Sequence, residues 1–204
     1  MDAIIHLGGI AGEAAWGQLL RHNVEGTVNV FEAARRAGVT RLIYASTNHV
    51  TGLYPAGRVI SGTSPPRPDS RYGLSKGMGE EIAAFYAYKY SIRTLCIRIG
   101  SFTPRPQNRR ALSTWISQRD MLQLVQLGLT ADYRFEIIYG VSGNTRSWWD
   151  NTNAIRLGYR PVDNAENYAD MVENIVSDVP LERAFQGGDR VSEEFAGTLD
   201  WLNR

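Results

Sequence analysis

The chain is poor in features that would each indicate a particular class of protein. Its single cysteine, Cys96, cannot form an internal disulfide, which argues against a disulfide-stapled secreted domain. No apolar run approaches the ~20 residues that a membrane helix needs, and residues 1–6 lack a signal-peptide layout. The formal net charge is +1, which gives no strong attraction to nucleic acid or anionic membranes. We therefore expect a cytoplasmic globular protein without nucleic-acid or membrane partners.

Lysine is also scarce, and its placement is informative. Of the 22 basic residues only Lys76 and Lys89 are lysines, and Lys76 follows Tyr72 by four positions. On a helix these two residues share a face, and the ammonium would lower the tyrosine pKa from about 10. Tyr72 is thus a candidate general base. The competing interpretation is an exposed helical Tyr/Lys pair without chemistry.

Hydrophobic periodicity predicts alternating strands and helices. Short apolar runs predict buried strands at 3–7, 42–45, 92–99 and 134–139, and the 92–99 strand would bury Cys96 as an inert core thiol. Helical patterns cover about 14–37, 71–90 and 114–127, with Met78, Ile82 and Phe85 expected on the apolar face of the second. This alternation predicts an α/β fold: a Rossmann-like parallel sheet flanked by helices, in a single domain over 1–204.

Polar clusters follow three of the predicted strands. They occupy residues 8–12, 46–49 and 100–110. In open parallel sheets ligands bind outside the carboxyl ends of the strands, so these clusters are expected to meet at one site. No metal-ligand pattern accompanies them.

Four motifs resemble the extended short-chain dehydrogenase/reductases, the NAD-dependent epimerase/dehydratase family. They are residues 6–9, the helix phrase at 23–34, the strand end at 45–47, and Tyr72 with Lys76. Further segments resemble uronate dehydrogenases, which oxidise D-glucuronate or D-galacturonate at C1 with NAD to the aldarolactone. These segments are 98–110, 112–115, 148–151, 163–166 and 185–188. The resemblance implies NAD as cofactor, a sugar acid as substrate, and a small substrate-binding part drawn from about 101–188.

The resemblance also assigns roles to individual residues. Tyr72 would be the catalytic base, Lys76 would lower its pKa and hydrogen-bond the nicotinamide ribose, and Thr47 would hold the reacting hydroxyl. The substrate would be bound by a second group: Asn48, His49, Ser101 and Arg110, with Arg110 gripping the carboxylate and Arg109 the alternative. The cofactor would contact Leu7, Gly8, Gly9, Lys76 and Phe102.

This sequence departs from the family pattern in two places. Ala11 stands where close relatives carry a substrate-contacting serine. The family also begins with a strand, a glycine-rich turn and a helix, and the resemblance implies that the chain is N-terminally truncated relative to it. Residues 8–12 could instead be the dinucleotide turn, but their spacing is not G-x-G-x-x-G and the next strand ends without a carboxylate.

Two other functions remain open at this point. One is a nucleotide-sugar epimerase or dehydratase of the same superfamily. The other is a catalytically silent fragment with impaired cofactor binding and an exposed sheet edge at residues 3–7, which would self-associate. The choice between NAD and NADP, the preferred sugar and the oligomeric state are not fixed by the sequence, although a homo-oligomer is expected by analogy.

Overall fold

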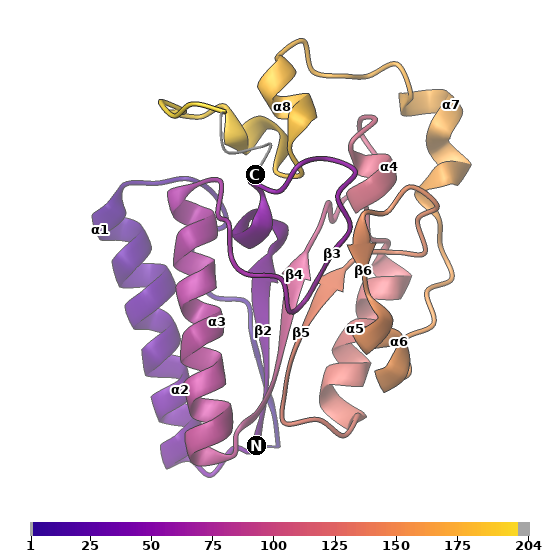
Figure 1. Ribbon diagram of the computed structural model, residues 1–204. Coiled ribbons are helices and arrows are strands. Elements are labelled where there is room, and N and C mark those ends of the chain that lie inside the picture. The colour runs from indigo at the N-terminus through magenta and orange to yellow at the C-terminus, as the bar shows by residue number, and fades with distance from the viewer. Residues whose placement is uncertain (1, 200–204) are drawn as a thin grey trace.

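The computed structural model describes residues 2–199 and contains a parallel four-stranded sheet (Figure 1). Its strand order is β1-β2-β4-β5, from β1 (Ile4–His6), β2 (Arg41–Thr47), β4 (Arg93–Ile99) and β5 (Phe135–Gly140). A separate two-stranded sheet pairs β3 (Ile60–Ser61) with β6 (Trp149–Asp150). The predicted Rossmann-like fold and its four main strands are therefore confirmed.

Helices cover both faces of the sheet (Figure 1). On one face lie α1 (Trp16–Leu19), the π-helical turn η1 (Leu20–Glu25), α2 (Gly26–Arg36) and α3 (Arg71–Tyr90). On the other lie α5 (Gln118–Thr130) and α6 (Thr152–Leu157). The remaining helical elements are short. They are η2 (Asn48–Thr51), α4 (Ala111–Thr114), η3 (Ala165–Tyr168), α7 (Ala169–Val172), α8 (Pro180–Ala184) and η4 (Gly188–Val191). Among the described residues no helix is long and apolar enough to cross a membrane.

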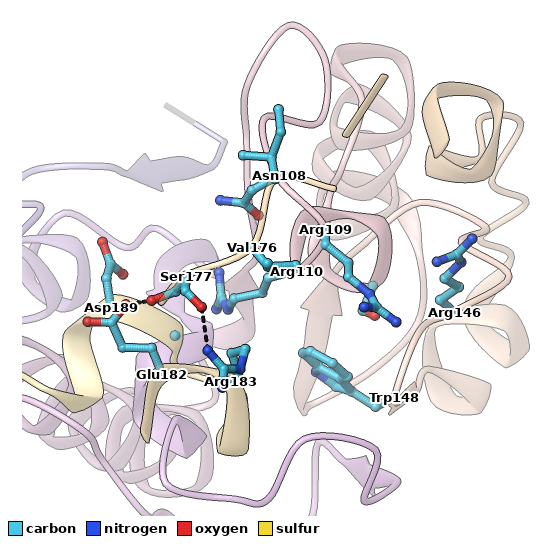
Figure 2. Close-up of a pocket in the computed structure, with 13 residues that line it drawn as sticks. Asn108, Arg109, Arg110, Arg146, Trp148, Val176, Ser177, Glu182, Arg183 and Asp189 are labelled. Atoms are coloured by element: carbon cyan, nitrogen blue, oxygen red, sulfur yellow. Dashed lines mark hydrogen bonds between the residues drawn. The ribbon is translucent and has the colours of Figure 1, made fainter. Parts of the chain in front are cut away.

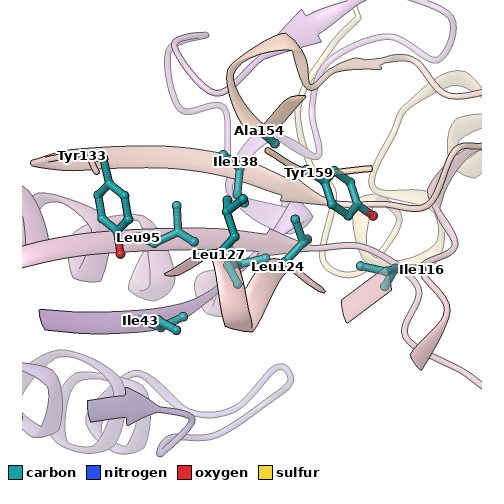
Figure 3. Packing of buried hydrophobic residues seen from close by; sticks show 10 residues of the cluster. Ile43, Leu95, Ile116, Leu124, Leu127, Tyr133, Ile138, Ala154 and Tyr159 are labelled. Atoms are coloured by element: carbon teal, nitrogen blue, oxygen red, sulfur yellow. The ribbon is translucent and has the colours of Figure 1, made fainter. Parts of the chain in front are cut away.

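The main core lies between the sheet and α5 (Figure 3). Ile43, Leu95 and Ile138 project from three neighbouring strands, and Leu124 projects toward them from α5, all with 2% exposure or less. Each fully buried aliphatic side chain contributes about 1.5–3 kcal/mol of burial free energy. The predicted strands 42–45, 92–99 and 134–139 supply this apolar layer because their residues face a covered sheet. Cys96 is buried in the core on the opposite face, as expected.

The strand at the edge of the sheet is not buried. Within the described residues β1 pairs only with β2, Ile5 is 43% exposed, and Leu7 just after the strand is 69% exposed. The prediction of a buried strand at 3–7 is therefore wrong. The exposed sheet edge at residues 3–7, expected under the fragment interpretation, is instead what the structure shows.

Helix α3 has the predicted ends, but small residues supply much of its buried face. The Ser70 hydroxyl accepts from the Gly73 amide at 3.0 Å, and this cap fixes the start of the helix. A Cβ on Gly79 would lie 2.0 Å from the Tyr44 hydroxyl, so only a small residue lets the helix approach the sheet this closely. The exposed fractions of Met78 and Phe85 are 36% and 51%. The predicted apolar face is therefore only partly in contact with the core: Ile82 packs against a buried cluster, whereas Met78 and Phe85 are exposed. Small residues such as Gly79 and Ala83 supply much of the buried face instead.

The other two helices also differ from the sequence pattern in instructive ways. The helix predicted over 14–37 contains the π-turn η1, which includes Asn23, a fully buried side chain that bonds a neighbouring loop. The helix predicted from 114 begins at Gln118, because the Ser117 hydroxyl accepts from the Asp120 amide at 3.1 Å. The second difference comes from a side-chain cap that periodicity does not register.

A buried ion pair ties α3 to β4. Arg98 donates through Nε and Nη2 to the two oxygens of Glu80 at 2.9 and 2.8 Å, and both side chains are at most 2% exposed. The Ser46 hydroxyl adds a 2.5 Å hydrogen bond to Glu80. This network fixes the height of α3 on the sheet, and α3 carries Tyr72 and Lys76.

Breaking this pair should destabilise the protein strongly. We expect Arg98→Met to lower the free energy of unfolding by about 3 kcal/mol, because the Glu80 carboxylate would remain buried without its partner. The double variant Arg98→Met/Glu80→Gln, which buries no charge, should recover part of the loss. Urea denaturation measures both, with the exposed Arg36→Met as control. Equal stability of the wild type and Arg98→Met would contradict this account.

Candidate active site

Seven of the predicted site residues line one cavity of about 340 Å³ at the carboxyl ends of the strands. They come from the segment after β1, the end of β2 and the first turns of α3. They are Leu7, Gly9, Thr47, Asn48, His49, Tyr72 and Lys76. Two of the three polar clusters, 8–12 and 46–49, thus meet at this cavity, whereas only Gly100 of the cluster at 100–110 lines it. The functional roles of these residues stay predictions.

Tyr72 is held in the first turn of α3 and is 9% exposed. Its backbone amide donates to the Glu13 carboxylate at 2.9 Å, which ties the start of the helix to the loop after β1. Burial raises the pKa of Tyr72, while a hydrogen bond with Thr47 and the positive charge of Arg190 act to lower it. The predicted lowering of this pKa by Lys76 is not found. The phenol's cationic neighbour in the structure is Arg190.

Thr47 has two roles in the structure. It is the last residue of β2, in extended conformation, and its hydroxyl accepts from the His49 amide at 3.3 Å to cap η2. The same side chain lies near the Tyr72 phenol and acts to lower its pKa. A hydroxyl can donate and accept at once, so the cap and a role beside the phenol are compatible.

His49 is oriented by a residue that the sequence did not single out. Its Nδ1 lies 2.7 Å from Oδ2 of Asp69, whose side chain is fully buried. The Ser70 hydroxyl donates to the other Asp69 oxygen at 2.7 Å. Asp69 therefore fixes the plane of the imidazole and leaves Nε2 for a ligand. Asp69 ends a proline-rich loop, where no periodic pattern marks a functional side chain.

Lys76 is 4% exposed and lies on the cavity wall. Its Nζ is 5.0 Å from the centre of the Tyr44 ring, and the structure shows no ion pair for it within residues 2–199. Desolvation lowers the pKa of Lys76 from 10.5 to about 8. A buried ammonium with free donors fits the hydroxyls of a nicotinamide ribose.

Removing this buried charge should stabilise the protein while impairing its chemistry. The folded-state pKa of about 8 lies below the ordinary 10.5, so burying the charged form of Lys76 costs stability below pH 8. At neutral pH we expect Lys76→Met to raise the free energy of unfolding by on the order of 3 kcal/mol. The gain should shrink as the pH rises above 8, because the wild-type lysine then becomes neutral on folding.

The only other lysine supplies the matched control for this prediction. Lys89 lies on the same helix and is exposed, so Lys89→Met should leave stability nearly unchanged. Thermal unfolding of the three proteins between neutral pH and pH 9 measures the effect. A destabilised Lys76→Met variant would show that the ammonium has a compensating partner.

The turn after β1 fits a cofactor at close approach. Gly9 has φ of +140°, and a Cβ there would lie 2.7 Å from Oδ1 of Asn23. That Asn23 oxygen accepts from the Ile10 amide at 2.7 Å, and its nitrogen donates to the Ser75 hydroxyl at 2.9 Å. Asn23 thereby holds the turn against α3. The turn's open backbone and the adjacent Lys76 ammonium are suited to one end of a dinucleotide.

Four predicted site residues do not line this cavity. Gly8 lines a neighbouring hollow, and Phe102 is 52% exposed on the surface. The Ser101 hydroxyl shares a 2.8 Å hydrogen bond with Thr114. Arg110 lines a different and larger cavity, although it reaches the edge of the first through Asn48.

Arg110 connects the segment at Gln186 with Asn48 at the start of η2. Its Nε donates to the Gln186 carbonyl at 2.8 Å. With the Asn48 amide oriented to donate to the Ile99 carbonyl, the Asn48 oxygen accepts from Arg110 Nη2 at 2.9 Å. Burial lowers the pKa of Arg110, with Asp189 and Asp69 acting in the opposite sense. A guanidinium keeps its charge under such conditions and remains an anion ligand.

Arg190 lines the cavity and was missed by the sequence reasoning. It belongs to η4, and its Nη1 donates to Glu193 at 2.8 Å. It follows the 185–188 motif, and nothing in the local sequence distinguishes it from other surface arginines. Ala11, noted as a departure from the family, also lines the cavity. Within the part of the chain that the structure describes, no group of three or more His, Cys, Asp or Glu side chains could hold a metal.

Comparison with known proteins gives consistent matches. A family model described as the NAD dependent epimerase/dehydratase family matches residues 1–148. A uronate dehydrogenase of Pseudomonas putida is 48% identical over 174 residues, which are 85% of this chain and 65% of that relative. A uronate dehydrogenase of Pseudomonas syringae is 45% identical over 92% of this chain and 70% of its own length. This chain thus spans about two thirds of the length of these relatives.

Solved structures agree with this comparison. A mutant uronate dehydrogenase of Agrobacterium tumefaciens in complex with NAD superposes with a TM-score of 0.89 and 39% identity. The match covers 93% of this chain and 73% of that one.

Proposed function

The chain belongs to the NAD-dependent epimerase/dehydratase family, and from that premise we propose that it oxidises a uronate at C1 to the aldarolactone. The substrate would be D-glucuronate or D-galacturonate, and NAD would accept the hydride. The observation that carries the proposal is that Thr47, His49, Tyr72 and Lys76 line one cavity, with Arg110 at its edge. This set combines a proton acceptor, hydroxyl-binding groups and a cation for a carboxylate.

Oxidation of a cyclic hemiacetal removes a proton from the C1 hydroxyl and a hydride from C1. Tyr72 as phenolate would take the proton, and Thr47, which lines the same cavity, would hold the hydroxyl beside it. The charge of Arg190 favours the phenolate against the cost of burial. Bound NAD supplies the acceptor for the hydride.

The cofactor would be held by the residues of the turn after β1 and by Lys76. Leu7 and Gly9 line the cavity together with the Lys76 ammonium, and Gly8 is adjacent in the chain. Phe102 would be a further cofactor contact, because it follows the carboxyl end of β4 and its exposed side chain is free to meet a ligand there.

The sugar would be held from its opposite end. Arg110 would take the carboxylate bidentately, and this would orient C1 toward Tyr72. Asn48, positioned by its contact with Arg110, and His49, oriented by Asp69, would bind ring hydroxyls. Ser101 would contribute after exchanging its bond to Thr114. The segment from about 101 to 188, which includes α4, α7 and α8, would form the small substrate-binding part.

We also propose a cytoplasmic homo-oligomer. Apolar side chains are exposed on the outer face of α1 and α3, with Trp16 at 42% and Phe85 at 51%. A second copy covering this face would remove them from water. Size-exclusion chromatography with light scattering measures the assembly, and a monomer at all concentrations would refute it.

Substrate screening tests the proposed reaction. Purified protein with NAD should form NADH with D-galacturonate or D-glucuronate, and much more slowly with galactose, which lacks the carboxylate. No NADH with any free uronate would overturn the proposal. Turnover of UDP-sugars instead would favour the nucleotide-sugar epimerase or dehydratase alternative.

A further inference from the structure

A second cavity, of about 720 Å³, lies next to Arg110 (Figure 2). It is built from the loop before α4, the segment before β6, and the region around α8 and η4. Its volume is within the ~300–1,000 Å³ typical of small-molecule sites. The proposed mechanism uses none of its lining residues except Arg110.

One end of this cavity is rich in hydrogen-bond donors. Arg109, Arg146 and Trp148 lie together there (Figure 2). Arg146 forms ion pairs with Glu166 and Glu173 at 2.7 and 2.6 Å. Arg109 is held less tightly, because its distance to Glu173 is 3.5 Å and its side chain is 59% exposed. The indole nitrogen of Trp148 is buried and has no partner among the residues the structure describes. A buried N–H without an acceptor is costly, and a ligand oxygen would satisfy it.

The opposite end of the cavity offers acceptors. Glu182 and Asp189 lie there with Ser177 (Figure 2). The hydroxyls of Ser177 and Ser192 each donate to Glu182 at 2.5 Å and lower the pKa of its carboxyl. Ionised carboxylates with remaining lone pairs are good acceptors for the hydroxyls of a ligand.

The two ends together define the ligand chemistry. The basic end suits a carboxylate, and the acidic end suits hydroxyl groups. Four arginines and two acidic residues, Glu182 and Asp189, line the cavity, and one of the arginines, Arg146, is already paired with Glu166 and Glu173 outside the lining. The carboxylates at one end would repel part of a polyanion such as a nucleoside diphosphate, so the lining favours a polyhydroxylated carboxylate.

Arg110 separates this cavity from the catalytic one. A Cβ on Gly188, whose φ is +69°, would lie 2.7 Å from Arg110 Cδ, so the glycine lets the side chain pack in this position. From there its guanidinium contacts Asn48, which lines the catalytic cavity. An anion on either side would therefore act on the same guanidinium.

We infer that the cavity lined by Arg109, Trp148 and Glu182 is a second binding site for a sugar acid, adjoining the catalytic cavity across Arg110. The choice of a sugar acid over other hydroxy acids rests on the proposed function. The occupant is a uronate or the corresponding aldarate, since both carry a carboxylate and a chain of hydroxyls.

Calorimetric titration of the protein tests this inference. Galactarate is the probe for the aldarate and D-galacturonate, without NAD, is the probe for the uronate. We expect Arg109→Gln and Trp148→Phe each to weaken at least one of the two binding events about tenfold, since each removes a donor at the basic end. Arg119→Gln, an exposed arginine paired with Asp163, is the matched control and should change nothing.

Each outcome decides a separate point. Binding unaffected by both Arg109→Gln and Trp148→Phe, in variants that unfold at the wild-type temperature, would overturn the second site. Tighter Arg109-dependent binding of ADP than of either sugar acid would overturn the ligand class. NADH formation without Arg109-dependent binding refutes only the second site, and Arg109-dependent binding without NADH formation refutes only the proposed reaction.

Discussion

Tyr72→Phe is expected to lower kcat/KM for uronate oxidation by about a thousandfold, within the 10²–10⁴ range of general acid–base catalysis. The substitution removes one oxygen from a side chain that is 9% exposed and keeps the ring that packs in the cavity wall. The fold should therefore remain, because Tyr72 is anchored through its backbone amide to Glu13. Thr47 would keep its cap on η2.

The measurement is steady-state NADH formation with D-galacturonate, together with thermal unfolding of each variant. Tyr88→Phe, on the same helix and 66% exposed, is the matched control and should retain full activity. Turnover by Tyr72→Phe within tenfold of the wild type would remove Tyr72 from the role of base.

The placement of the site could be predicted because strong local signals determined it. The cap at Ser70 and the length of the helical pattern set the bounds of α3, and alternation of strands and helices set the parallel sheet. The carboxyl ends of parallel strands share one edge of the sheet, which brings Thr47, Asn48 and His49 to the start of α3. Topology does not direct every side chain that follows a strand, since Ser101 and Phe102 lie outside the cavity. These inferences depend on periodicity and topology, which the sequence carries directly.

The electrostatics of the site could not be predicted in the same way. Four-residue spacing places Tyr72 and Lys76 on one helix face, but it does not determine the conformation of the long lysine side chain or the position of its ammonium group. In the structure the Lys76 ammonium lies over Tyr44, and Arg190, remote in sequence, supplies the charge that acts on Tyr72. Asp69 likewise reaches His49 through tertiary packing: a Cβ on Gly52 or Gly187 would lie 1.7 or 2.0 Å from its carboxylate.

The second large effect is expected for Arg110→Ala. Removing this guanidinium should lower kcat/KM for D-galacturonate about a thousandfold, or about 4 kcal/mol, because it would leave the substrate carboxylate without its charged partner. The rate with galactose at high concentration should change little, since that sugar has no carboxylate to lose. Arg110→Lys keeps the charge but not the fork of donors, and it should recover only part of the loss.

Arg110 also makes hydrogen bonds within the protein. Comparing galacturonate with galactose distinguishes this structural role from recognition of the carboxylate. Its Nε and Nη2 bond the Gln186 carbonyl and the Asn48 oxygen, so truncation could displace Asn48 in the catalytic cavity. A displaced Asn48 would slow both sugars alike, because ring hydroxyls are common to both. Equal losses with galacturonate and galactose would therefore assign Arg110 to scaffolding, while Arg119→Ala controls for the loss of an exposed arginine. A loss confined to the uronate requires the guanidinium to bind the carboxylate directly, since that group is the difference between the two substrates.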